Sequence, residues 1–277
     1  GLMSSPDSAL QDFLRAHRRI LVISGAGCST PSGIADYRDA DGEWKYATPI
    51  MAQDFVRDVS TRQRYWARSM RGWPDFATAR PNAAHSALVA MQRLGVLCGL
   101  ITQNVDGLHG QAGHQQVIEL HGNLRWVVCL GCGDRVSRAD VQTWLQQENS
   151  FVLDVAATPA PDGDAELGVD LRGVRVPACV RCGAPLKPDV VFYGESVPTA
   201  RVQEAYALVD AADAVLVVGS SLMVYSSYRF IRRARERSLP MAAVNQGKTR
   251  ADDWLQIKVA DDCAAVLPRL LDGLAPG

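Results

Sequence analysis

Two pairs of cysteines in this chain have the spacing of metal ligands. Two residues separate Cys129 from Cys132 and Cys179 from Cys182, and a glycine follows each pair directly. Such a turn can direct two thiolates at one ion, and a glycine with a positive φ lets backbone amides turn toward the sulfurs. The spacing predicts a tetrahedral zinc site with four thiolate ligands, and four small buried cysteines or redox thiols are the alternatives. Because such a shell has no open coordination position, the zinc would be structural and the chemistry would lie elsewhere.

A second set of candidate residues is rich in glycine. Gly25, Gly27 and Ser29 follow the apolar run 19–23. Glycines there can let backbone amides approach a pyrophosphate, although a plain strand-to-helix turn explains the pattern equally well. The proline and the glycines within 31–42 break up any helix that would begin here, so this is not a dehydrogenase fingerprint.

Polar side chains follow other apolar runs. Gln103, Asn104 and Asp106 come after the run 98–102, and His121 stands at a further strand-to-loop junction. Taken singly these are weak signals, because Asn and Asp are common in turns and most single histidines are structural. Two later runs end in Gly219, Ser220 and Ser221 and in Asn245, Gln246 and Gly247.

The elements that must position these residues alternate between strand and helix. Ser5 and Pro6 predict the start of a first helix. Apolar runs predict buried parallel strands at 19–23, 98–102, 214–218 and 240–245, with helical patterns at 199–209 and 225–236. The alternation predicts an α/β fold with a doubly wound, Rossmann-like parallel sheet, which binds ligands at the carboxyl ends of its strands.

Two stretches interrupt this alternation. Residues 41–75 are rich in Arg and Trp, and residues 126–184 carry the four paired cysteines. We expect the two stretches to pack together as a smaller helical and zinc-binding domain. The remaining residues, 1–40, 76–125 and 185–277, would form a discontinuous Rossmann-like domain.

The composition argues against several function classes. The 277 residues carry a net charge of −1, which provides no electrostatic footprint for nucleic acid or for an anionic membrane. No apolar run reaches the ~18 residues that would span a bilayer. Once four of the seven cysteines are assigned to zinc, Cys28, Cys98 and Cys263 form no disulfide framework, which predicts a reducing, cytoplasmic location.

In their order along the chain, these motifs resemble the sirtuins, the NAD-dependent protein deacylases, and look most like the class II branch. The resemblance spans residues 20–263. Ala35 stands where the family usually has proline, and Cys28 where it usually has an aliphatic residue. The motifs are Gly-Ala-Gly-Cys-Ser at 25–29, Gly-Ile-Ala-Asp-Tyr-Arg at 33–38, Thr-Gln-Asn-Val-Asp at 102–106, His-Gly at 121–122, both cysteine pairs, Lys-Pro-Asp-Val-Val-Phe-Tyr-Gly-Glu at 187–195, Gly-Ser-Ser-Leu at 219–222 and Val-Asn at 244–245.

The resemblance implies that NAD is consumed as a co-substrate, with the acyl group of an acyl-lysine ending on ADP-ribose as nicotinamide leaves. His121 would be the general base that takes a ribose hydroxyl proton, with Asn104 beside it in the catalytic site. The residues that would contact NAD are Gly25, Ala26, Gly27, Ser29, Tyr37, Arg38, Gln103, Asn104, Asp106, Gly219, Ser220, Ser221, Asn245, Gln246, Gly247 and Cys263.

The resemblance also implies how an acylated protein or peptide would bind. Val191, Phe192, Tyr193 and Gly194 resemble the strand to which the substrate peptide adds as an extra strand. Backbone pairing would then supply much of the affinity, and specificity for the peptide sequence would be loose.

Tyr65 and Arg68 lie three residues apart on a helix that is predicted to begin near Ser60. The sirtuins that remove succinyl groups carry a Tyr-x-x-Arg pair there, and a hydroxyl together with a guanidinium suits the carboxylate of such an acyl chain. A basic, solvated helix face explains Arg68 equally well.

Two other classes of function fit the sequence less well. A dinucleotide-dependent oxidoreductase would need a Gly-x-Gly-x-x-Gly turn opening a helix, which is absent. A zinc-dependent nucleic-acid module conflicts with the near-neutral charge. Protein mono-ADP-ribosyl transfer uses the same NAD chemistry and stays the alternative within the family.

Overall fold

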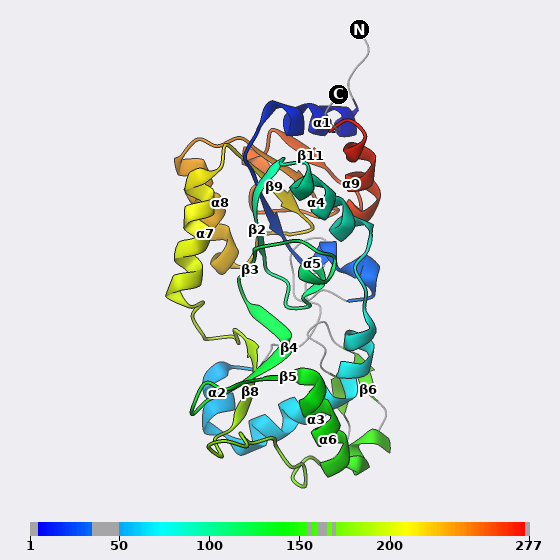
Figure 1. The fold of residues 1–277 in the computed structure, drawn as a ribbon, viewed down its shortest axis with the longest axis vertical. Coiled ribbons are helices and arrows are strands. Elements are labelled where there is room, and N and C mark those ends of the chain that lie inside the picture. Colours follow the sequence, from blue (N-terminus) through cyan, green and yellow to red (C-terminus); the bar gives the residue numbers. More distant parts are fainter. Residues whose placement is uncertain (1–4, 35–49, 155–156, 160–164, 168–169, 275–277) are drawn as a thin grey trace.

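The computed structural model describes residues 5–34, 50–154, 157–159, 165–167 and 170–274. Tyr37 and Arg38, two of the residues expected to contact NAD, lie outside the described residues, as does Ala35. The described part forms a large sheet with helices on both faces, and a smaller group of strands and helices lies below it in Figure 1.

Six parallel strands make the large sheet. In spatial order they are β11 (Ile257–Val259), β10 (Met241–Val244), β9 (Ala214–Val218), β1 (Ile20–Ser24), β2 (Leu97–Thr102) and β3 (Val117–Glu119). All neighbouring strands pair in parallel, which confirms the predicted doubly wound α/β class. From β1 the chain adds β2 and β3 on one side of the sheet. It then returns to the other side of β1 and adds β9, β10 and β11, so the strand order reverses between β1 and β9.

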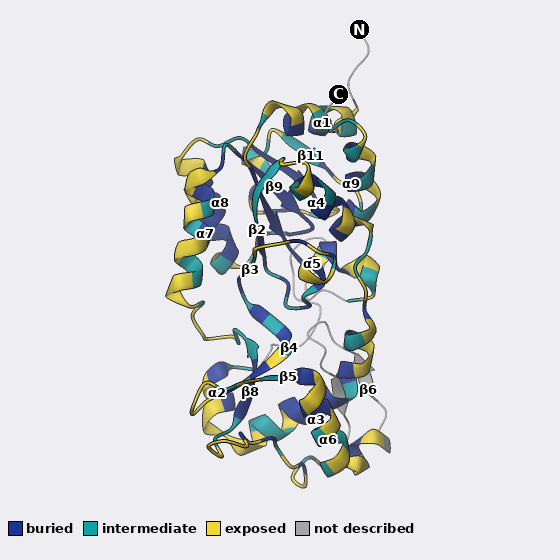
Figure 2. Ribbon diagram, viewed as in Figure 1, coloured by how far each residue is buried: buried dark blue, intermediate teal, exposed yellow. Residues whose placement is uncertain are grey.

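Helices cover both faces of this sheet (Figure 1). α1 (Pro6–Ala16), α4 (Ala83–Arg93) and α9 (Cys263–Leu271) pack on one face, and α7 (Thr199–Ala211) and α8 (Tyr225–Glu236) on the other. Ile20 and Val22 of β1 join the first hydrophobic cluster, whereas Leu21 and Ile23 join the second. Because both faces are covered, the central strands are buried throughout, and Figure 2 shows them in dark blue between helices with exposed outer faces.

Local sequence signals set several of these helices. The Ser5 side chain accepts a hydrogen bond from the Ser8 amide, and Pro6 begins α1, as predicted. Leu10 and Phe13 bury the apolar face of α1 against the sheet. Helix α8 occupies the predicted range, because its apolar residues recur with helical period and pack on the second face.

The smaller group is built around an antiparallel sheet. Its order is β5 (Arg135–Ser137), β4 (Gly122–Cys129) and β8 (Leu186–Val190), and a separate two-stranded sheet pairs β6 (Ala157–Pro159) with β7 (Ala165–Leu167). Three helices lie beside these strands, α2 (Ala52–Arg57), α3 (Val59–Thr78) and α6 (Arg138–Glu148). One hydrophobic cluster joins Phe55, Trp66 and Met70 to Val127 and Leu145. Segments that precede and follow β2 in the sequence therefore pack together.

Short helical turns complete the described chain. They are α5 (Leu108–Gln111) and four 3-10 turns, Ala26–Cys28, Thr30–Ser32, Ser150–Asp154 and Asp252–Trp254. As expected, no α-helix begins in the described residues between Gly25 and Gly33. Within the described residues, no helix combines the length and the apolar character that a bilayer crossing needs.

Candidate active site

Loops from three strands meet at the carboxyl edge of the large sheet, where the strand order reverses. The Gly27 amide donates to Gly219 O at 2.8 Å, which joins the loops after β1 and β9. A Cβ on Gly25 would lie 2.7 Å from Gln103 Oε1 and 2.7 Å from Ser220 Cβ. Only glycine permits this approach, which brings residues from three separate motifs into contact.

A buried polar network fixes the loop after β1 against the loop after β2. The Asn104 Nδ2 donates to Gly25 O at 2.9 Å and to Ser29 Oγ at 3.3 Å. Ser29 Oγ donates to Asp106 Oδ2 at 2.6 Å, and Asp106 Oδ1 accepts from the Leu108 amide at 2.9 Å. Asn104, Ser29 and Asp106 are all buried. Each carboxylate oxygen therefore has a donor, and the network can hold its shape without solvent.

His121 lies between β3 and β4 and is held from two sides. Its Nδ1 is 3.2 Å from Gln103 O, and its Nε2 is 2.7 Å from Ser226 Oγ. A carbonyl oxygen can only accept, so Nδ1 carries the proton of the neutral ring. Nε2 then has the free lone pair, which accepts from the Ser226 hydroxyl and can take a proton from another hydroxyl in its place.

The surroundings of His121 favour its neutral form. Burial lowers the pKa of His121, and the nearby positive charges of Arg201 and Arg229 lower it further, against the hydrogen bond to the Gln103 carbonyl, which raises it. A neutral imidazole is the form that acts as a general base.

Gln103 connects this base to two other elements. Its Oε1 accepts from the Ser220 hydroxyl in the loop after β9, and its Nε2 donates to Ser227 Oγ on α8 at 2.6 Å. Its backbone carbonyl holds His121. One residue therefore ties the sheet edge, α8 and the candidate base together.

The other residues expected near NAD lie along the same edge of the sheet. The Cys263 thiol donates to Gly27 O at 3.4 Å. Asn245, directly after β10, donates from Nδ2 to Gly247 O at 2.9 Å. The loops after β1, β9 and β10 also contain Ala26, Ser221 and Gln246.

The four paired cysteines form one cluster. The Sγ of Cys129 lies 3.3 Å from that of Cys182, and the Sγ of Cys132 lies 3.7 Å from that of Cys179. Zn–S bonds of about 2.3 Å in a tetrahedron place sulfurs about 3.8 Å apart. The cluster therefore fits one structural zinc ion.

The glycines that follow the two zinc turns have the expected left-handed backbone conformation. Gly133 and Gly183 have φ of +75° and +78°, as predicted. Their amides bond to the carbonyl oxygens of Cys129 and Cys179 and thereby close the turns. Amides face sulfur at Gly131, Cys132 and Arg181 within the turns, and at Asp134 and Ala184 directly after the two glycines. The positive φ of each glycine therefore turns the next amide toward a sulfur, as expected, and amides within the turns also stabilise the sulfur charge.

The segment expected to receive the substrate is an extended chain rather than a full strand. β8 ends one residue before Val191, whose amide donates to His121 O at 2.8 Å. Tyr193 O accepts from the Ala52 amide at 2.8 Å, and Gly194 turns the chain with φ of +83°. The ladder stops because the chain turns here, and the segment lies directly against His121.

Tyr65 and Arg68 lie on α3, which begins at Val59, close to the predicted start. Tyr65 is buried, and its ring centroid lies 5.4 Å from that of Phe192 in the expected substrate segment. Arg68 is half-buried on the same helix. The structure thus places the tyrosine of the pair against the substrate segment.

Four residues around His121 and Gln103 are not identified by the sequence patterns. They are Arg201, Ser226, Ser227 and Arg229. Two adjacent serines shortly after the Gly-Ser-Ser-Leu motif are the only signal that the sequence offers. Their contacts depend on how α8 packs on the sheet.

Three histidines are buried behind the loop after β1. Ligand atoms of Cys28, His85 and His109 lie within 4.8 Å of one another. The His85 Nδ1 accepts from the Asn82 amide at 3.0 Å, so its proton is on Nε2 and the ring offers the cluster no lone pair. We therefore interpret the cluster as packing. Burial lowers the pKa of all three histidines, and that of His114 to about 4.

Comparison with known proteins gives consistent matches over nearly the whole chain. The model of the Sir2 family matches residues 25–226. An "NAD-dependent protein deacetylase" of Xanthomonas campestris pv. campestris (strain B100) is 56% identical over 260 residues, which cover 94% of this chain and 89% of that protein. An "NAD-dependent protein deacetylase 2" of Bradyrhizobium diazoefficiens is 52% identical over 266 residues, which cover 96% of this chain and 97% of that protein. A solved structure described as "Sir2-p53 peptide-NAD+" has a TM-score of 0.78 and 30% identity, and the match covers 95% of this chain and 96% of that chain.

Proposed function

The chain belongs to the Sir2 family, and on this premise we propose that it is an NAD-dependent protein lysine deacylase. The reaction transfers the acyl group of an acyl-lysine in a protein or peptide to ADP-ribose and releases nicotinamide. The names of the relatives and of the structural neighbour support the use of NAD and of a peptide substrate.

The observation that carries this proposal is the setting of His121. It is a half-buried, neutral imidazole with its Nε2 lone pair at the sheet edge, next to the network of Asn104, Ser29 and Asp106. The close packing of Gly25 and Gly27 on Gln103, Ser220 and Gly219 fixes this loop at the point where the strand order reverses, and a parallel α/β sheet binds its nucleotide there. When bound, NAD supplies the ribose carbon that receives the acyl oxygen and nicotinamide as the leaving group.

The residues of the chain contribute orientation and one proton transfer. Gln103, Asn104 and Asp106 offer fixed amide and carboxylate groups to the nicotinamide ribose and the carboxamide. The His121 Nε2 accepts a ribose hydroxyl proton once that hydroxyl replaces Ser226 as its donor. The zinc cluster lies at the small sheet, where Cys129 ends β4, and its role is to stabilise that part of the fold.

Incubation with NAD and a panel of acyl-lysine peptides, followed by mass spectrometry, tests the proposal. We expect deacylated peptide, nicotinamide and acyl-ADP-ribose in equal amounts. His121→Ala should bind NAD and melt like the parent but show no turnover, because the base acts only in the transition state. Full activity of that variant would remove His121 from the mechanism. A mass gain of ADP-ribose on protein without deacylation would favour the ADP-ribosyl transfer alternative.

We also propose that Val191, Phe192, Tyr193 and Gly194 bind the substrate chain and that Tyr65 and Arg68 read the far end of the acyl group. Two contacts support this placement, the Val191 bond to His121 O and the packing of Tyr65 on Phe192. A hydroxyl and a guanidinium suit an acyl chain that ends in a carboxylate.

A two-part organisation is proposed for the chain, with an NAD-binding domain of residues 1–40, 76–125 and 185–277 and a smaller domain of residues 41–75 and 126–184. Separate hydrophobic clusters on the large sheet and beside the small sheet support this division, and β4 and β8 connect the two. We propose a cytoplasmic location, which suits a chain whose seven cysteines form no disulfide.

A further inference from the structure

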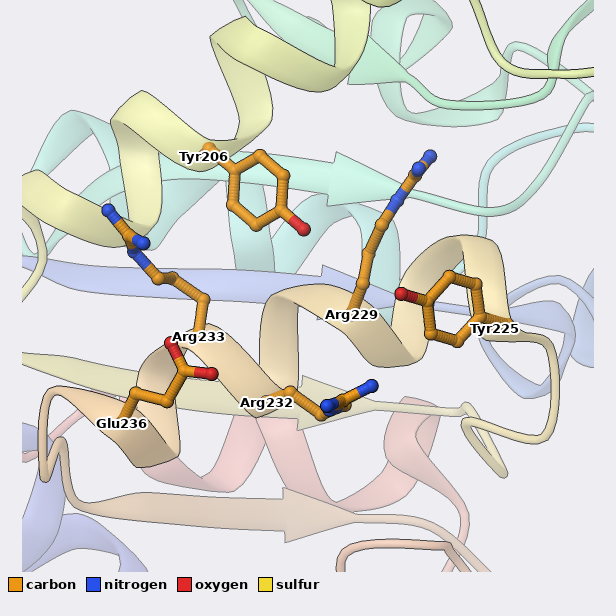
Figure 3. Close-up of a pocket in the computed structure, with 6 residues that line it drawn as sticks. All are labelled: Tyr206, Tyr225, Arg229, Arg232, Arg233 and Glu236. Atoms are coloured by element: carbon orange, nitrogen blue, oxygen red, sulfur yellow. The ribbon is translucent and has the colours of Figure 1, made fainter.

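One face of α8 carries a cluster of charged and aromatic side chains. Its members project from the same side of the helix, because successive members are one, three or four residues apart in the sequence. They are Tyr225, Arg229, Arg232, Arg233 and Glu236. Together with Tyr206 of α7 they line a pocket of about 320 Å³, shown in Figure 3.

The positive charge of this pocket is only partly neutralised. Arg233 makes two parallel hydrogen bonds with Asp210, at 2.9 and 3.1 Å, and is therefore paired. Among the described residues, neither Arg229 nor Arg232 forms an ion pair, and the Nη2 of Arg229 is buried without a hydrogen-bond partner. A buried guanidinium N–H without an acceptor is costly, so the pocket is suited to an anionic group.

The pocket lies beside the candidate base. Ser226, in the first turn of α8, contacts the Nε2 of His121, and the Arg229 side chain donates from Nε to Ser226 O at 2.9 Å. On its other side His121 is bonded through its carbonyl to Val191. His121 therefore lies between the substrate segment and the N-terminal end of α8.

Large apolar side chains are exposed on both sides of His121. Tyr193 is 47% exposed in the substrate segment, and Val224 and Tyr225 are 37% and 58% exposed at the start of α8. A polypeptide placed across His121 would cover them, and its neighbouring side chains would reach the α8 pocket.

We propose that the α8 pocket binds an Asp or Glu side chain of the substrate polypeptide close to the acyl-lysine. The carboxylate is held by the guanidinium of Arg232 and the hydroxyl of Tyr225, and Arg229, whose guanidinium points away from that of Arg232 in Figure 3, adds positive charge to the same pocket. This rests on the proposed deacylase function and adds a sequence preference to the loose specificity of backbone pairing.

The test uses sets of three acyl-lysine peptides. Within a set the peptides are identical except at one position, which carries Glu, Gln or Lys, and the sets place this position at each site within about three residues of the acyl-lysine. At the best position we expect KM to be about fivefold lower for Glu than for Gln and higher again for Lys, which matches about 1 kcal/mol for one partly solvated ion pair. The differences should shrink at high salt, because salt screens such pairs.

Variants on α8 identify the pocket as the source of the preference. Arg232→Gln should remove most of the preference, and Arg232→Glu should invert it in favour of Lys. Arg235→Gln is the matched control, since Arg235 lies on the same helix but its guanidinium stacks over Trp254 at 4.0 Å, outside the pocket.

Equal KM for the Glu, Gln and Lys peptides at every position would overturn the inference and leave the deacylase function intact. A preference that survives both Arg232 variants would overturn the assignment to this pocket. If no peptide is turned over, the proposed function fails, and peptide affinities measured by fluorescence anisotropy still decide whether the pocket selects acidic side chains.

Discussion

The hydroxyl of Ser226 determines how basic His121 is. It donates to Nε2, and a donor there favours the neutral ring. Burial separately lowers the pKa of His121. In Ser226→Ala the pKa should rise by up to about one unit, since one hydrogen bond contributes about 1 kcal/mol. Activity requires the neutral ring, and Ser226 contacts His121 only in the free enzyme, so the acid limb of kcat/KM against pH should move to higher pH.

Ser226→Thr is the matched control, because it keeps the hydroxyl and should restore the parent profile. Melting curves should be the same for all three proteins. An acid limb that does not move in Ser226→Ala would show that this hydroxyl has no influence on the base.

Arg68 is the residue on which the preferred acyl group depends. If its guanidinium meets the end of the acyl chain, then succinyl and glutaryl peptides should react faster than acetyl peptides. Arg68→Met should reverse this order and leave the affinity for NAD unchanged, because only a contact with the acyl end is lost. Rates with the three peptides measured side by side decide the matter. Equal ratios in parent and variant would assign Arg68 to the helix surface.

At the scale of elements, the zinc cluster joins the ends of two strands. Cys129 ends β4, and the turn with Cys182 leads into β8. Cys129→Ser, or removal of zinc by a chelator, should unfold the small sheet, lower the melting temperature and abolish activity as a consequence. Following circular dichroism and activity on the same sample tests whether unfolding accompanies the loss of activity. Loss of activity with the melting temperature unchanged would mean that the metal takes part in the reaction.

Some elements could be predicted from the sequence and others could not. The strands β1, β2, β9 and β10 are continuous apolar runs, because helices cover them on both faces. β3 and β11 are three residues long and contain Glu119 and Lys258, so they have no apolar signature and exist only because a neighbouring strand pairs with them.

The same reasoning applies to the candidate site. Glycines and polar residues at strand ends could be predicted to gather, because a parallel sheet brings those ends to one edge. The contact of Ser226 with His121 joins residues 105 positions apart, and it depends on the packing of α8. The end of β8 before Val191 follows from a local turn at Gly194 and from the Tyr193 contact with Ala52.

At the scale of the whole molecule, the buried histidines set how stability depends on pH. Burial lowers the pKa of His85, His109 and His114, and that of His114 to about 4, whereas an unfolded histidine titrates near pH 6.5. The unfolded chain then binds more protons between these values, so stability is full above about pH 6.5 and falls as the pH drops toward 4.

The contribution of His114 to this loss should be roughly 2 kcal/mol once solvent screening is allowed for. Urea unfolding at several pH values, compared for the parent and His114→Gln, measures it. The variant should lose less stability on acidification. Parallel curves for the two proteins would contradict the assignment to His114.

Cys129 and Leu186 are direct partners across β4 and β8. The chain that leaves β4 after Cys129 passes through β5 and α6 and enters β8 at a position adjacent to where it left. Lengthening a segment whose ends already meet costs little chain entropy, about 0.6 kcal/mol for each doubling of a flexible loop. An extra residue inside β1, in contrast, would shift its pairing with both neighbours and turn its apolar side chains to the wrong faces. Extra residues in the loops between β5 and β8 can therefore be accommodated while the nucleotide edge of the molecule keeps its geometry.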